Sequence, residues 1–77
     1  MNKVLFFAAL KDIVGQESLL VEASGKTVSE IKNLLKNDYP ALPLDVAMTA
    51  INEEFALDGD VISKEDIIAF IPPVSGG

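Results

Sequence analysis

The chain has 77 residues, of which 49% are hydrophobic and 23% charged, and its twelve acidic and six basic side chains give a net charge of −6. This length predicts one small domain, and the negative charge argues against binding to nucleic acid or to an anionic membrane. Because the sequence has no cysteine and no histidine, it excludes a disulfide framework, thiolate and zinc sites, and the commonest catalytic base.

The first predicted elements are two strands joined as a hairpin. Residues 1–9 form an almost unbroken apolar run that is typical of a buried strand, and residues 18–22 predict its partner. The intervening residues 12–14 are expected to form one helical turn before Gly15. The apolar run is too short to cross a membrane and lacks a convincing cleavage site, so we expect a cytoplasmic protein.

A helix is predicted to begin at Val28, because Thr27 and Glu30 have the spacing of a capping box. Pro40 disfavours helical geometry at Tyr39 and should end it. The helix is expected to bury Val28, Ile31, Leu34 and Leu35 and to expose Glu30, Lys32, Asn33 and Lys36.

The second half predicts a strand over residues 47–51, a turn over 52–54, a short segment over 55–57 and a final buried strand over 67–71, with polar turns at 58–60 and 63–66. The two apolar runs should pair in parallel at the centre of the sheet, because the helix provides the required crossover. We therefore predict an α+β fold, a β-grasp (ubiquitin-like) roll with a mixed sheet, over residues 1–71. Residues 72–77 are expected to form a flexible, extended tail.

The tail is the strongest functional signal. It consists of Pro72, Pro73, Val74, Ser75, Gly76 and Gly77. The prolines favour extended geometry, and the glycines lack a Cβ, so this segment is thin enough to thread into a channel of another protein. There the Gly77 carboxylate could be activated by adenylation and attacked either by an amine or by sulfur. The competing interpretation is a frayed chain end without function.

Several segments together resemble the sulfur-carrier small subunits of molybdopterin synthase, in the ubiquitin-like MoaD/ThiS-like family. The segments that carry this resemblance are Val4 to Ala8, Val14-Gly15, Thr27-Val28, Ala50 to Asn52 and, above all, Ala69 to Gly77. The similarity runs the whole length of the chain. The sequence departs from the family pattern at Lys64-Glu65-Asp66, where an Asp-Gly-Asp turn is common. This departure leaves the type of the turn open.

The resemblance implies a cycle in which a ubiquitin-activating-like adenylyltransferase uses ATP to adenylate Gly77, and a sulfur donor system converts it to a thiocarboxylate. The carrier would then donate sulfur to cyclic pyranopterin monophosphate to form the dithiolene of molybdopterin. It would act within a heterotetramer of two small and two large subunits. The catalytic side chains would belong to the large subunit, so this chain is expected to be a non-catalytic sulfur donor that binds no cofactor itself.

The resemblance also implies that Phe7, Phe55 and Ile71 dock against the partners. The competing interpretation is ordinary core packing, since apolar strand residues are mostly buried. An exposed patch that contains all three residues would favour docking.

Three other functions remain open from the sequence. These are a ubiquitin-like modifier joined to target lysines through Gly77, a thiamine-pathway sulfur carrier, and a plain interaction module. The acidic groups at residues 53–54, 58–60 and 65–66 lack the spacing of a calcium loop, so solvated turns are expected there and no metal site.

Overall fold

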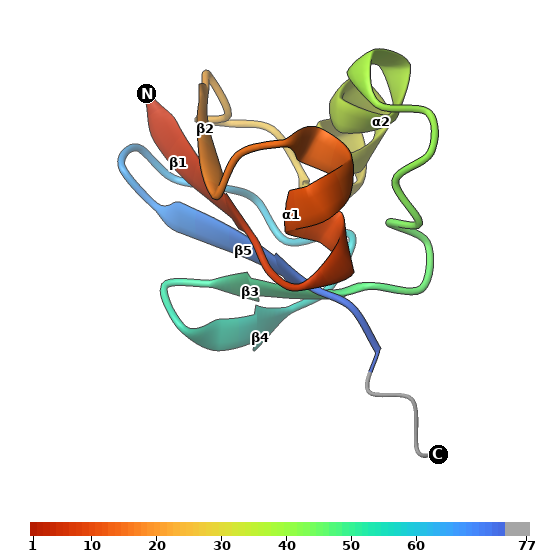
Figure 1. Ribbon diagram of the computed structural model, residues 1–77. Coiled ribbons are helices and arrows are strands. Elements are labelled where there is room, and N and C mark those ends of the chain that lie inside the picture. Colours follow the sequence, from red (N-terminus) through yellow and green to blue (C-terminus); the bar gives the residue numbers. More distant parts are fainter. Residues whose placement is uncertain (74–77) are drawn as a thin grey trace.

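The computed structural model describes residues 1–73 and contains one five-stranded sheet and two helices, which lie on the same side of the sheet (Figure 1). The elements in chain order are β1 (Asn2–Phe6), α1 (Ala9–Val14), β2 (Ser18–Val21), α2 (Val28–Asp38), β3 (Met48–Ile51), β4 (Glu54–Ala56) and β5 (Ile67–Ile71). Within residues 1–73, neither helix has the length and apolar content needed to cross a membrane.

The sheet has the order β2-β1-β5-β3-β4. Its centre is the parallel pair β1 and β5, in which Val4 lies opposite Ile68 and Phe6 opposite Phe70. All the other pairs are antiparallel. The predicted β-grasp roll and the predicted pairing of the two apolar runs are therefore confirmed.

The core lies between one face of the sheet and the helices. Val4, Phe6, Ile68 and Phe70 alternate along the two central strands and are almost completely buried. The rings of Phe6 and Phe70 stack with their centroids 6.2 Å apart. Because successive side chains of a strand point to opposite faces, the alternate residues of β1 and β5 face away from the helices.

Helix α2 begins where the sequence predicts. The Glu30 backbone N–H donates to Thr27 Oγ1 over 3.2 Å, and the Thr27 backbone N–H donates to Glu30 Oε1 over 3.0 Å, which completes the capping box. At the other end, the Tyr39 N–H donates to the Leu35 carbonyl over 2.7 Å. Local hydrogen bonds thus satisfy backbone groups at both ends of the helix.

The predicted buried stripe of α2 is wrong at two positions. Leu34 is 43% exposed, whereas the Lys32 side chain is only 15% exposed and places Nζ 2.7 Å from Asp58 Oδ1. Lys32 lies four residues after Val28 and three before Leu35, so it falls between two buried residues on the helix surface. Its aliphatic stem can therefore cover apolar surface while its ammonium group reaches a carboxylate.

The first strand is shorter than predicted. It ends at Phe6, and Ala9 opens α1, because Ala8 adopts a φ of 52° in a turn that the Leu10 N–H closes by donating to the Phe7 carbonyl over 3.1 Å. An apolar run does not by itself distinguish strand from helix. Helix α1 is also longer than the single turn expected, and it ends at Gly15, whose φ of 83° suits a glycine.

A two-residue turn, Asn52-Glu53, joins β3 to β4, and both of its residues have positive φ. Glu54, which was predicted to lie in the turn, instead opens β4. The Asn52 side chain fixes the turn against the start of β5, because Oδ1 accepts from the Ile67 N–H over 2.9 Å and Nδ2 donates to Asp66 Oδ1 over 2.8 Å. At the next corner Glu65 has a φ of 67°, so the departure from the expected Asp-Gly-Asp pattern leaves a non-glycine residue in the left-handed region.

Asn2 is a fully buried polar residue at the start of β1. Its Nδ2 donates to the carbonyls of Ser63 and Asp66, each over 2.9 Å, and its Oδ1 accepts from the Ala23 N–H and the Ser24 hydroxyl. One side chain thereby joins the segment that follows β2 to the corner that precedes β5.

Candidate functional site

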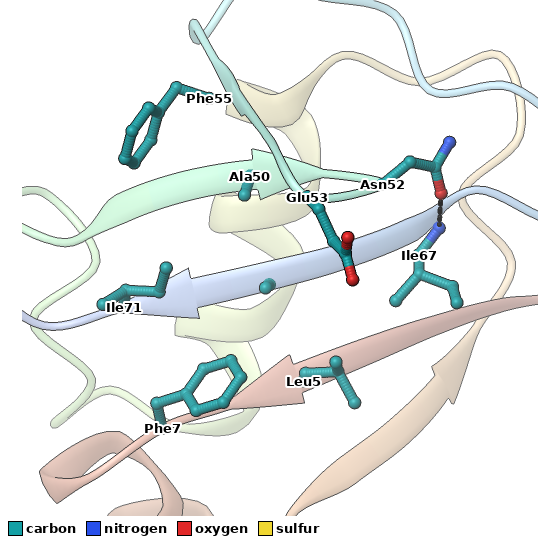
Figure 2. Close-up of a pocket in the computed structure, with 9 residues that line it drawn as sticks. Leu5, Phe7, Ala50, Asn52, Glu53, Phe55, Ile67 and Ile71 are labelled. Atoms are coloured by element: carbon teal, nitrogen blue, oxygen red, sulfur yellow. Dashed lines mark hydrogen bonds between the residues drawn. The ribbon is translucent and has the colours of Figure 1, made fainter.

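The face of the sheet that points away from the helices carries a groove of about 600 Å³ (Figure 2). Its lining consists of Leu5, Phe7, Ala50, Asn52, Glu53, Phe55, Ile67, Ala69 and Ile71. These residues come from β1, β3, β4, β5 and the connections next to them, so the groove depends on the whole β-grasp fold and not on a single loop.

The groove arises from side-chain size along one row of the sheet. The register places Leu5 opposite Ala69, Ala69 opposite Ala50, and Ala50 opposite Phe55. Large side chains therefore stand on the outer strands of the row, and two methyl groups form its floor. Since directly opposite residues share a face of the sheet, this large-small-small-large order makes a trough.

The structure brings the three predicted docking residues together in this groove. Phe7 is 46% exposed and Phe55 is 78% exposed, while Ile71 is half-buried at the end of β5. Core packing therefore does not account for the two phenylalanines. A shared, exposed apolar surface is what docking to another protein requires, so the geometry favours the docking interpretation.

The predicted tail begins directly at this groove. Ile71 ends β5, and Pro72 and Pro73 follow it, the first half-buried and the second exposed. The predictions for Val74, Ser75, Gly76 and Gly77 fall outside the described residues. The end of the groove that Ile71 lines is thus the point from which the chain continues toward the predicted reactive residue.

Most of the groove is not evident from the sequence patterns. They predict Leu5, Ala50, Ala69 and Ile67 as strand residues and Glu53 as part of a turn, without placing them on one surface. The signal for Leu5, Ala69 and Ile67 was available in the alternation of the two apolar runs, and that for Ala50 in the predicted strand over residues 47–51, because every second residue of a strand faces the same side. The strand register, which decides how the rows align, could not be inferred from the sequence.

The groove is lined mainly by apolar side chains. Among residues 1–73 its lining contains no Ser, Thr, Cys, Lys or His, and no three His, Cys, Asp or Glu side chains of these residues are placed to hold a metal ion. The site is therefore suited to binding an apolar protein surface.

Glu30 lies in the capping box and not in the groove. Its pKa is held below the ordinary glutamate value, chiefly by the hydrogen bond from the Thr27 backbone.

Comparison with known sequences gives a consistent result. The profile of the ThiS family matches residues 4–77. A relative from Dictyostelium discoideum, named molybdopterin synthase sulfur carrier subunit, is 37% identical over 81 residues, which covers 97% of this chain and 94% of the relative.

Two solved structures show the same fold. SAMP1 from Haloferax volcanii, a small archaeal modifier protein, superposes with a TM-score of 0.77 at 27% identity and covers 99% of this chain and 98% of its own. A chain from the Helicobacter pylori complex of subunits 1 and 2 of molybdopterin-converting factor has a TM-score of 0.73 at 24% identity. The match covers 99% of this chain and 97% of the Helicobacter pylori chain.

Proposed function

Because the chain belongs to the ThiS family, we propose that it is the sulfur carrier subunit of a molybdopterin synthase. The observation that carries this proposal is the 37% identity, over almost the whole chain, to a relative that bears this name. The composition supports it, because a chain without cysteine or histidine has neither of the side chains that most often carry sulfur or move protons at neutral pH. The transferred atom would instead be held on the main chain, at Gly77.

We infer three chemical steps at Gly77. A carboxylate oxygen attacks the α-phosphorus of ATP in the active site of an adenylyltransferase, and pyrophosphate leaves. Sulfur at the sulfide oxidation level, supplied by the donor system, then attacks the acyl adenylate, and AMP leaves to give a thiocarboxylate. The thiocarboxylate sulfur finally attacks a carbon of cyclic pyranopterin monophosphate, and water hydrolyses the acyl–sulfur bond, which returns Gly77 to its carboxylate. Since ATP is the co-substrate of the first step, we propose that the cycle runs in the cytoplasm.

In this proposal the groove is the surface that the partners recognise. Phe7, Phe55 and Ile71 dock against the large subunit, and they dock in turn against the activating enzyme. When Ile71 docks, Pro72 and Pro73 would direct the residues after them into the partner. The restricted φ of the two prolines lowers the conformational entropy that the tail loses on threading. The Helicobacter pylori complex supports the view that a chain of this fold can assemble with a second subunit. We propose a heterotetramer of two small and two large subunits.

The test is the intact mass of the chain after incubation with its activating enzyme, ATP and a sulfur source. We expect a mass increase equal to the replacement of one oxygen by sulfur. Deletion of Gly77, or addition of one alanine after it, should abolish the increase and leave the thermal unfolding midpoint unchanged. Sulfur transfer by either variant at the wild-type level would refute the role of Gly77.

The likeness to SAMP1 makes protein modification the second candidate. In that case the adenylated Gly77 would be attacked by lysine amines of other proteins. Incubation with a cell extract and ATP distinguishes the two functions, because a modifier forms isopeptide-linked products of higher mass. A carrier gives only the thiocarboxylate.

A further inference from the structure

The groove contains one charge, which belongs to Glu53. Among residues 1–73, Glu53 is the only charged residue of the lining, and its neighbours there include Phe7 and Phe55. In Figure 2 its side chain points back from the Asn52-Glu53 turn over β5, and not away from the sheet. A carboxylate therefore stands above a mainly apolar surface.

The turn itself does not require a glutamate at this position. Asn52 has a φ of 51° and Glu53 a φ of 70°, which is the left-handed geometry of a two-residue hairpin turn of type I′. The second position of such a turn favours glycine, because a Cβ is disfavoured at positive φ. Glycine would close the same turn with less strain. An outlier of this kind, next to a functional surface, points to a role for the side chain.

The Glu53 carboxylate forms no ion pair within residues 1–73. The ion pairs within residues 1–73 join Lys11 to Glu17, Lys32 to Asp58 and Lys36 to Asp45. A protein that fills the groove removes water from around the Glu53 carboxylate, and this is unfavourable unless the carboxylate gains a charged or hydrogen-bonding partner. A lysine or arginine of the occupant would meet this requirement, because it supplies both a positive charge and hydrogen-bond donors.

We propose that Glu53 selects the docking partner by charge, and that the partner presents an apolar patch with a lysine or arginine placed to pair with Glu53. This inference rests on the proposed function, in which the groove docks the large subunit. A second copy of this chain is a poorer occupant, because each copy has a net charge of −6 and the two would repel. The ion pair at the edge of the groove would add specificity and association rate more than affinity.

The test measures binding of the large subunit to the full-length chain and to its Glu53→Gln and Glu53→Lys variants. At low salt we expect Glu53→Gln to raise Kd about two- to fivefold, the range of a partly exposed ion pair, and Glu53→Lys to raise it further. The difference from wild type should shrink near 1 M salt, where the screening length falls to about 3 Å.

Glu54→Gln is the matched control. It removes the same charge from the adjacent residue, which is also exposed, but Glu54 lies opposite Ile51 and so faces the other side of the sheet from Phe55. We expect its Kd to equal that of wild type. An equal loss of affinity in both variants would show an effect of net charge alone and would overturn the inference.

Glu53→Gly tests the same side chain without risk to the fold, because glycine suits the turn. It should unfold at a temperature equal to or above that of wild type and yet bind as weakly as Glu53→Gln. If the wild-type chain binds, and Glu53→Gln and Glu53→Gly bind as tightly as wild type, the inference alone is overturned. If the wild-type chain does not bind the large subunit at any salt concentration, the proposed function fails and the inference fails with it. Self-association that depends on Glu53, measured by sedimentation, would also overturn the inference.

Discussion

Replacement of Phe55 by alanine should separate binding from stability. The ring is 78% exposed in the free chain, so complete covering by a partner would remove on the order of 150 Å² of apolar surface. At about 25 cal/mol per Å² this corresponds to at most ~4 kcal/mol, which agrees with the effect of truncating a central interface residue. We therefore expect Phe55→Ala to weaken docking by about 2–4 kcal/mol, or roughly 30- to 1000-fold in Kd.

The same substitution should hardly change folding, because the ring buries little surface within the free chain. Phe70 is the internal comparison, since it is the same residue type, faces the helices and is fully buried. Phe55→Ala should change the free energy of unfolding by less than about 1 kcal/mol, and Phe70→Ala should lower it by about 3–5 kcal/mol. Urea unfolding provides the stability and calorimetric titration with the large subunit provides Kd. Unchanged affinity of Phe55→Ala, or a loss of stability equal to that of Phe70→Ala, would refute the assignment of this face to docking.

Three further predictions concern the body of the fold. Asn2→Ala should lower the free energy of unfolding by about 2–4 kcal/mol because it leaves buried hydrogen-bonding groups unpaired, and a shift of the urea midpoint at constant slope would show this. Gly15→Ala should lower the free energy of unfolding by about 1 kcal/mol, whereas Gly59→Ala should leave it unchanged or raise it by up to ~1 kcal/mol. The reason is that a Cβ has room at both sites, but of the two only Gly15 has positive φ. Equal shifts of the thermal midpoint in the two variants would contradict this. Glu30 has a lowered pKa in the folded chain, so its contribution to the free energy of unfolding is full above the ordinary glutamate pKa and is lost as the pH falls through the folded pKa. The difference in stability between wild type and Glu30→Gln should therefore shrink on acidification. A difference independent of pH would disprove this account.

The main features of the fold were predictable because they depend on local patterns. Thr27 and Glu30, only three residues apart, specify the start of α2 through their hydrogen bonds. Two long apolar runs are sufficient to indicate a buried central pair of strands. The errors occur where two structures fit the same pattern. Ala8 and Ala9 continue an apolar run, and nothing in that run shows that Ala8 adopts positive φ and turns the chain into α1.

The candidate site was only partly predictable because it depends on register. Phe7, Phe55 and Ile71 were expected at the docking surface, and the structure brings them together, although their role remains a prediction. The floor of the groove was missed because Ala50 and Ala69 become neighbours only when β3 and β5 pair in one particular alignment. The position of the Glu53 carboxylate depends on the handedness of a two-residue turn, which this dipeptide does not reveal.

The place of β5 in the sheet has a mechanical consequence. This strand is hydrogen-bonded along both edges, to β1 and to β3, and it leads directly into Pro72. A pull on the C-terminal end, directed along the strand, would therefore load both ladders in shear, so that many bonds share the force. An edge strand such as β4 is held by one ladder alone, so fewer bonds would resist the same pull. The domain is built to withstand traction at the end where a partner would grip it.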